Sequence, residues 1–232
     1  MKKSLSFIIT LFFTFIMSNQ LCHAAIKAVV FDFGGVCVYF NERSIVEFIA
    51  KEFNIPVETV KKELLDCIKP ASSGQINEDT VWPDFANRCQ VTIPENWKQN
   101  WETFFSKNLQ LNAPIFSIIE SLQEQGFQTP LLSNILPSQA AICRQEHKFD
   151  AFTQVFLSCE IGSSKPDFSA YQTVIDQLQL KPEECLFVDD SPANVEGAKK
   201  AGMDSFCFNC KKDRIDLVIK ELAARGITVT IP

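Results

Sequence analysis

Histidine, basic charge and long apolar runs are all scarce in this sequence, and each shortage excludes a class of function. The 232 residues include only two histidines, which argues against a metal site or mechanism that needs several of them. Lysine and arginine number 22 against 28 acidic residues, and this net charge of −6 argues against a nucleic-acid-binding protein. No apolar run reaches the roughly 20 residues that a membrane-spanning helix needs.

The first 24 residues have the pattern of a secretory signal peptide. Two lysines precede an uncharged, largely apolar run from Leu5 to Met17, and a short segment that ends in small residues follows. Such signals combine a basic start, a short apolar centre and a small-residue cleavage site. We therefore predict cleavage near Ala24 and export to the periplasm or the medium, with an uncleaved membrane anchor as the alternative. His147 is then the remaining histidine, and its polar neighbours predict a solvent-exposed residue.

Short apolar runs alternate with helical patterns over most of the chain. The runs occur at residues 27–33, 129–134, 154–158, 184–189 and 205–208, and the helical patterns at residues 115–125, 168–178, 194–201 and 214–224. Apolar runs of this length predict strands that are buried on both faces. Strands that alternate with helices predict an α/β fold, with a parallel, Rossmann-like sheet and right-handed crossovers.

Residues 41–110 form a different kind of segment. They have helical patterns at residues 44–53 and 57–68 and no convincing buried strand, and they contain Trp82, Trp97 and Trp101. We expect most of these aromatic residues to form a small helical core, with one or two facing a substrate. The predicted organisation is a signal peptide at 1–24, a core domain formed by 25–40 and 111–232, and a helical insertion at 41–110.

Polar residues stand where the predicted strands end. They are Asp32, Ser133, Asn134, Asp189 and Asp190, and Lys165 lies in a loop after a further strand. In an open parallel sheet, ligands bind outside the carboxyl ends of the strands. Three carboxylates, a hydroxyl and a lysine at this edge predict a site for a phosphate and a metal ion.

Four short motifs contain these residues. They read Val29-Val-Phe-Asp-Phe-Gly-Gly-Val36, Leu131-Leu-Ser-Asn134, Ser164-Lys-Pro-Asp167 and Leu186-Phe-Val-Asp-Asp-Ser-Pro-Ala-Asn194. In this order they resemble the motifs of the haloacid dehalogenase-like (HAD) superfamily, and the resemblance covers essentially the whole chain after the signal. It implies a HAD core domain, with the helical insertion as a cap that closes over the site and selects the substrate.

The resemblance also implies a reaction. Asp32 would be the nucleophile that attacks phosphorus and forms an aspartyl-phosphate, which water then hydrolyses. Ser133, Asn134 and Lys165 would bind the transferring phosphoryl group, and Lys165 would also orient Asp32. The enzyme would be a phosphatase acting on a small phosphorylated metabolite, such as a sugar phosphate.

By the same resemblance, the site would hold Mg²⁺. Asp190 would be the main carboxylate ligand, together with Asp32 and the backbone carbonyl of Gly34. Asp189 would be a further ligand or would support one. Crowded carboxylates raise one another's pKa, and a cation that prefers oxygen ligands relieves their repulsion.

Gly34 is also where the sequence departs from the family pattern. Family phosphatases typically carry a second aspartate here as general acid and base, whereas glycine has no group that transfers a proton. Since general acid catalysis is worth about 10²–10⁴-fold in rate, we expect slow turnover or a substrate with a good leaving group. A subgroup with glycine at this position includes sugar-phosphate phosphatases. Two alternatives remain: a dehalogenase or other C–X hydrolase, and a non-catalytic binding protein with this fold.

Three smaller features complete the sequence predictions. Cys207 and Cys210 have a Cys-x-x-Cys spacing, so they are the first candidates to pair if cysteines oxidise after export, and a redox role is the less favoured interpretation. Asn194 lies one helical turn after Asp190, where it either helps to orient the metal site or is a polar first-turn residue. Taken alone, Ser133 and Asn134 would be an ordinary turn, with Ser138 as the cap of the helix that follows.

Overall fold

The computed structural model describes residues 25–39 and 42–230. The predicted signal peptide, residues 1–24, lies outside the described residues, and its cleavage stays a prediction. Within the described ranges, no helix combines the length and apolar character that crossing a bilayer requires.

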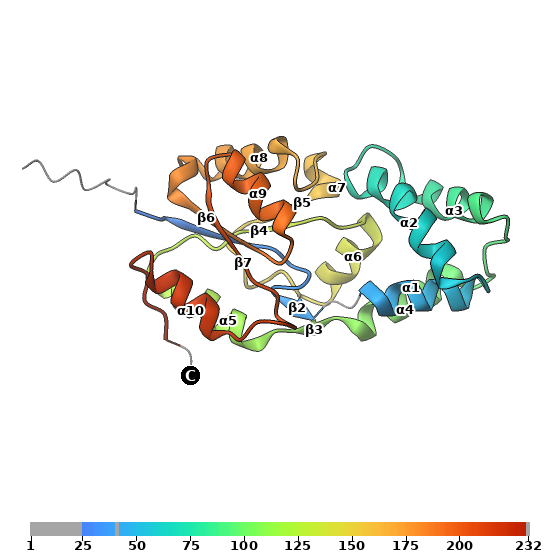
Figure 1. The fold of residues 1–232 in the computed structure, drawn as a ribbon, viewed down its shortest axis with the longest axis horizontal. Coiled ribbons are helices and arrows are strands. Elements are labelled where there is room, and N and C mark those ends of the chain that lie inside the picture. The colour runs from blue at the N-terminus through green and yellow to red at the C-terminus, as the bar shows by residue number, and fades with distance from the viewer. Residues whose placement is uncertain (1–24, 40–41, 231–232) are drawn as a thin grey trace, which may run out of the picture.

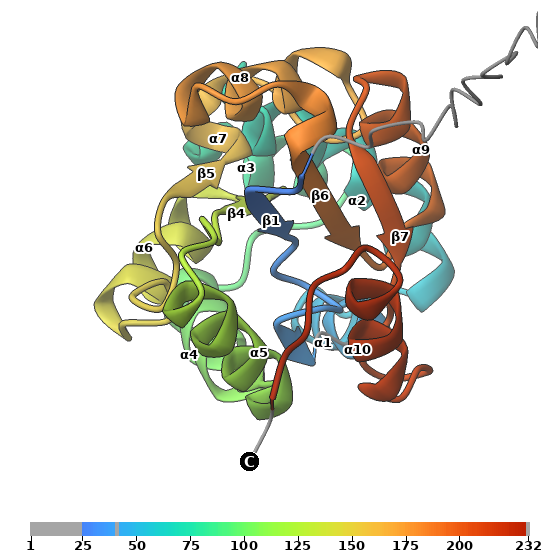
Figure 2. The same ribbon diagram turned by 90° about the vertical axis from the view of Figure 1, so that its left-hand side faces the viewer.

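A five-stranded parallel sheet forms the centre of the fold, in the order β5-β4-β1-β6-β7 (Figure 2). Its strands are β1 (Ala28–Phe31), β4 (Leu131–Ser133), β5 (Val155–Leu157), β6 (Cys185–Asp189) and β7 (Asp204–Cys207). Each lies within one of the five apolar runs or, for β7, begins one residue before it. The predicted α/β fold class with a parallel sheet is therefore confirmed.

Helices cover both faces of the sheet, as Figures 1 and 2 show. On one face lie α8 (Phe168–Leu178) and α9 (Pro192–Lys200), and on the other α5 (Ala113–Glu124) and α10 (Asp216–Ala223). In β1, Ala28 and Val30 pack in the cluster with α8, while Val29 and Phe31 pack in the cluster with α5 and α10. Because side chains point alternately to the two covered faces, every residue of β1 is apolar.

The segment between β2 (Val38–Tyr39) and β3 (Gln110–Leu111) is helical. These two short strands pair antiparallel, so the chain leaves the core and returns to it side by side. The helices between them are α1 (Glu42–Glu52), α2 (Val57–Ser72), the 3₁₀ turn η1 (Glu78–Thr80), α3 (Val81–Cys89) and α4 (Trp97–Asn108). Figure 1 shows them beyond the edge of the sheet toward which the strands point.

Aromatic side chains pack against one another inside these helices. Trp97 and Trp101 are buried and stack with ring centroids 5.8 Å apart, and Phe48 stacks on Phe104 at 4.1 Å. Such pairs contribute about 0.5–1.5 kcal/mol beyond the area they bury. The prediction that the tryptophans mainly form a small helical core is confirmed.

The helices differ from the sequence predictions in two details. Helix α2 continues past residue 68 to Ser72, through Pro70, because a proline near a helix end disrupts few hydrogen bonds. Helix α6 (Pro137–Gln145) begins at Pro137, since proline suits the first helical position, so Leu136 rather than Ser138 precedes the helix. Ser138 instead donates hydrogen bonds from its amide and hydroxyl to the Glu78 carboxylate, at 2.6 and 2.5 Å. The remaining elements are α7 (Ser158–Ile161) and η2 (Pro182–Glu184).

Candidate active site

The polar residues from separate strands meet at one edge of the sheet. Asp32 follows β1, which lies between β4 and β6, and Asp189 ends β6 with Asp190 directly after it. Asp32, Asp189 and Asp190 each offer a carboxylate oxygen, and these oxygens lie within 4.8 Å of one another. The structure thus brings together the carboxylates that the sequence analysis singled out.

Lys165 joins these carboxylates from the loop between α7 and α8. Its Nζ donates hydrogen bonds to Asp32 Oδ1 at 2.5 Å, Asp189 Oδ2 at 2.7 Å and the Leu132 carbonyl at 2.8 Å. Its side chain is only 1% exposed. Burial disfavours the charged amine, but Asp189 and Asp32 together keep the pKa of Lys165 above its ordinary value. The two carboxylates therefore favour the charged form of this buried lysine.

The carboxyl group of Asp32 titrates near neutrality in this environment. Burial raises its pKa from an ordinary 3.8 to about 7, Lys165 opposes the rise, and Asp189 and Asp190 add to it. Strongly shifted carboxyl groups with specific charged neighbours are typical of functional sites.

Ser133 and Asn134 follow one another at the end of β4 but make different contacts. Ser133 is buried, next to the Leu132 carbonyl that binds Lys165. Asn134 holds the Lys165 backbone from both sides: its Oδ1 accepts from the Lys165 amide at 2.9 Å, and its Nδ2 donates to the Lys165 carbonyl at 2.8 Å. This geometry favours a supporting role for Asn134; its predicted role in substrate binding stays a prediction.

Asp189 is fully buried, and protein donors reach both of its oxygens. Oδ1 accepts from the Ser191 amide at 2.8 Å, Oδ2 from Lys165, and Asn194 Nδ2 lies 3.0 and 3.1 Å from the two oxygens. Tyr171 in turn donates from its hydroxyl to the Asn194 carbonyl at 2.7 Å. Of the two interpretations of Asn194, the structure favours the orienting one, and the carboxylate that it orients is Asp189.

The turn after β1 depends on glycine at one position. Gly35 has φ +82°, and a Cβ added there would lie 2.3 Å from Asp190 Oδ2. Both the backbone conformation and the close approach of the carboxylate therefore require glycine. The close packing of this turn against Asp190 links the first motif to the last.

Asn209 makes a contact with the site that could not be expected from the sequence. Its Nδ2 donates to Asp190 Oδ2 at 3.0 Å from the loop after β7. Nothing in the local sequence signals this contact, because Asn209 stands inside the Cys-x-x-Cys segment that drew attention only for its thiols. All eight cysteines of the described residues are free, so Cys207 and Cys210 are unpaired with each other here.

His147 takes no part in this cluster. Its side chain is 79% exposed and its Nδ1 lies 2.9 Å from Asp150 Oδ2. The prediction of a solvent-exposed histidine is confirmed.

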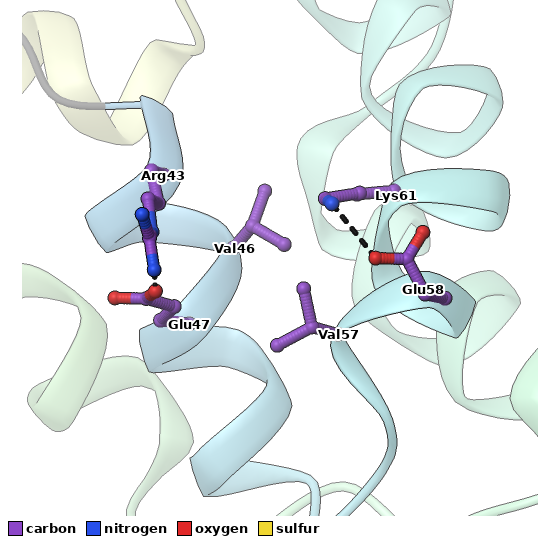
Figure 3. A pocket seen from close by; sticks show the side chains of 6 residues that line it. All are labelled: Arg43, Val46, Glu47, Val57, Glu58 and Lys61. Carbon is purple, nitrogen blue, oxygen red and sulfur yellow. Dashed lines mark hydrogen bonds and ion pairs between the residues drawn. The ribbon is translucent and has the colours of Figure 1, made fainter.

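A separate pocket lies between α1 and α2 and contains none of the strand-end residues (Figure 3). On one wall Arg43 pairs with Glu47 at 2.7 Å, and on the other Lys61 pairs with Glu58 at 2.8 Å. Because each wall neutralises its own charge, the pocket has no marked preference for an ionic ligand.

The residues at the sheet edge fit a magnesium ion. Mg²⁺ is usually bound by one or two protein carboxylates and retains oxygen ligands from water or phosphate. The three neighbouring carboxylates supply such donors, and Asp189 and Asp190 add to the rise that burial causes in the pKa of Asp32.

Comparisons with known proteins identify the family of this chain. The family model for haloacid dehalogenase-like hydrolases matches residues 26–202. The chain is 32% identical over 177 residues to flavin mononucleotide hydrolase 1 of Arabidopsis thaliana, covering 74% of this chain and 69% of that protein. It is 27% identical to the D-ribitol-5-phosphate phosphatase of Bacteroides thetaiotaomicron, covering 78% and 91% of the two chains.

A solved structure shows the same fold. The HAD family enzyme bt-2542 of Bacteroides thetaiotaomicron, in complex with magnesium and inorganic phosphate, superposes with a TM-score of 0.67. The two chains are 21% identical, and the match covers 83% of this chain and 99% of that one.

The fold and the site together define a hydrolase with an α/β core and a helical insertion beyond the strand ends. The chain belongs to the haloacid dehalogenase-like hydrolases.

Proposed function

We propose that this protein is an exported, Mg²⁺-dependent phosphatase that hydrolyses a small phosphomonoester through an aspartyl-phosphate on Asp32. The observation that carries the proposal is the buried contact of Asp32 with Lys165, beside Asp190 at the carboxyl ends of the strands. The relatives named as a flavin mononucleotide hydrolase and a ribitol-5-phosphate phosphatase support a phosphorylated metabolite as substrate. Residues 41–110 serve as the cap over the site.

The positions of the side chains support the following reaction. Lys165 binds Oδ1 of Asp32, so we assign Oδ2 as the oxygen that attacks phosphorus as the bond to the leaving oxygen breaks. The ammonium group of Lys165 also offsets the charge of the phosphoryl oxygens, and Ser133, at the neighbouring strand end, donates to one of them. Water then attacks phosphorus, which releases phosphate and regenerates Asp32.

Asp190, Asp32 and the backbone carbonyl of Gly34 would hold Mg²⁺, which stabilises the charge on the phosphoryl group when it is bound. Asp189 fits the supporting role, because Lys165, Ser191 and Asn194 already bind its oxygens. It holds Lys165 in place and keeps it charged. If Asp32 and Lys165 acted without a metal ion, the enzyme would instead be a dehalogenase.

A substrate panel with and without the metal tests the proposal. The purified protein is expected to release phosphate from p-nitrophenyl phosphate, flavin mononucleotide and pentitol or sugar phosphates in Mg²⁺, and to stop in excess EDTA. Added Mg²⁺ should restore the activity. Release of halide from 2-haloacids in EDTA would show that the protein is a dehalogenase. Ligand binding without any turnover would show that it is a non-catalytic binding protein.

Gly34 predicts how the rate depends on the leaving group. Gly34 is not among the glycines that adopt a positive φ, so its backbone conformation does not by itself require glycine. Gly34→Asp is expected to speed hydrolysis of alkyl phosphates by up to about 10²-fold and to change p-nitrophenyl phosphate little, because only the poor leaving group needs a proton. Gly34→Asn, which has the same shape and transfers no proton, is the matched control. Equal rates for the two variants on alkyl phosphates would contradict the missing-acid account.

If the protein is exported, its N-terminal signal peptide should be removed. When the gene is expressed in a cell with a working secretion pathway, the N-terminal sequence of the exported protein should begin within a few residues after Ala24. A protein that keeps residues 1–24 and stays with the membrane fraction would show the uncleaved anchor.

A further inference from the structure

The carboxylate of Asp190 is held by a residue outside the four motifs. Asn209, in the loop between β7 and α10 (Figure 2), donates from Nδ2 to Asp190 Oδ2 at 3.0 Å. The same oxygen faces Gly35, where a Cβ would approach to 2.3 Å. Asp190 Oδ2 is thus confined between an amide donor on one side and bare backbone on the other.

The orientation of the Asn209 amide follows from its other contacts. Its Oδ1 accepts from the Lys211 amide at 3.0 Å, an Asx turn in which the side chain binds the backbone two residues ahead. Because Oδ1 is engaged with a donor, the NH₂ group must be the end that faces Asp190. The side chain therefore presents a donor, and not an acceptor, to the carboxylate.

The loop itself is anchored on both sides of Asn209. The Phe208 amide donates to the Asp189 carbonyl at 3.0 Å, and the Cys210 amide donates to the Gly35 carbonyl at 2.8 Å. The Phe208 side chain is buried, and the Asn209 amide donates to Asp213 Oδ2 at 2.8 Å. These bonds tie the loop to the first and last motifs, so Asn209 is fixed relative to both.

We infer that Asn209 is a positioning residue for the metal site: its amide fixes the rotation of the Asp190 carboxylate, so that the carboxylate is oriented for Mg²⁺ before the metal binds. The inference rests on the proposed role of Asp190 as a metal ligand. Partners of metal ligands of this kind typically contribute 10–100-fold to metal affinity. Asn209 shares this role with Gly35, which shapes the space for the same oxygen.

The test measures metal binding without substrate. Purified wild-type protein and variants are titrated with Mn²⁺, and free Mn²⁺ is followed by electron paramagnetic resonance. Asn209→Ser keeps an oxygen that accepts the Lys211 amide, but its hydroxyl is too short to reach Asp190. Asn209→Leu removes both contacts while keeping the same number and branching of side-chain heavy atoms. Both variants are expected to bind Mn²⁺ about 10-fold more weakly, with the loss of turnover recovered at saturating Mg²⁺.

The controls separate this inference from the function on which it rests. Asn87→Ser, the same change on the exposed face of α3, should leave the Mn²⁺ affinity unchanged. Asp190→Asn should abolish binding; if it does not, the proposed metal site is wrong. If Asp190→Asn abolishes binding while Asn209→Ser stays within two-fold of wild type, the positioning role alone is refuted. Weaker Mn²⁺ binding in Asn209→Leu but not in Asn209→Ser would assign the effect to the Asx turn rather than to the amide donor. That result would also refute the positioning role.

Discussion

Replacing Asp32 by asparagine is expected to reduce phosphatase turnover by at least about 10³-fold, which is the scale of losses seen when a covalent nucleophile is removed. Asparagine keeps the shape of the side chain but has no carboxylate oxygen that attacks phosphorus. The measurement is phosphate release from p-nitrophenyl phosphate in Mg²⁺. Rapid acid quenching of the wild-type enzyme should also trap phosphate on the peptide that contains Asp32, and the variant should trap none.

An exposed carboxylate provides the control for this variant. Asp150→Asn removes a carboxylate that is 69% exposed and pairs with His147, so turnover should stay at the wild-type rate. If Asp32→Asn keeps turnover within 10-fold of wild type, Asp32 is not the nucleophile. The aspartyl-phosphate mechanism would then have to be abandoned.

Replacing Lys165 by methionine is expected to abolish turnover and to destabilise the fold. Methionine fills a similar volume, but Asp32 and Asp189, 9% and 0% exposed at their side chains, would lose their shared counter-charge. Removing one partner of a buried ion pair typically costs about 3–5 kcal/mol in the free energy of unfolding. Urea denaturation near neutral pH in EDTA measures the loss.

The matched control is Lys199→Met. Lys199 pairs with Glu196 at 2.8 Å, but its side chain is 50% exposed, so the expected change is at most about 1 kcal/mol. Similar losses in free energy of unfolding for the two variants would mean that the buried contacts of Lys165 stabilise the fold no more than an exposed ion pair does.

The contribution of Asp32 to the free energy of unfolding should also change with pH, in a direction that its pKa fixes. The Asp32 carboxyl has a pKa of about 7 in the folded protein and 3.8 ordinarily, because burial outweighs the effect of Lys165. Between these values the folded state binds more protons than the unfolded state, so the contribution of Asp32 to stability falls as pH rises toward 7. Without Lys165 this pKa should rise further. The loss in free energy of unfolding caused by Lys165→Met should therefore be smaller in mildly acidic than in mildly alkaline buffer.

The central sheet and the motif residues were predictable from the sequence for a physical reason. Strands covered on both faces are largely apolar, so β1 and the first four residues of β6 appear as unbroken apolar runs. Parallel strands bring their carboxyl ends to one edge, so the residues that follow them had to meet there. Asp32, Asp189 and Asp190 were identified in this way, and the structure places their oxygens together.

Contacts between side chains from distant segments could not be predicted in the same way. Ser138 was expected to cap a helix, but its position beside Glu78 depends on how the insertion meets the core. The role of Asn209 depends on where the loop after β7 passes relative to Asp190. Neither relation leaves a periodic or local pattern in the sequence.

By itself, the sequence indicated the family, through the four motifs that resemble it, together with the order of the strands along the chain and the polar residues at their ends, because short motifs and apolar runs are local properties. Only the tertiary structure decided how the three carboxylates differ. Lys165 engages Asp32 and Asp189, Asn194 also binds Asp189, and Asn209 binds Asp190. The three acids have the same functional group, and their separate environments arise only when the loops after β5, β6 and β7 pack around the sheet edge.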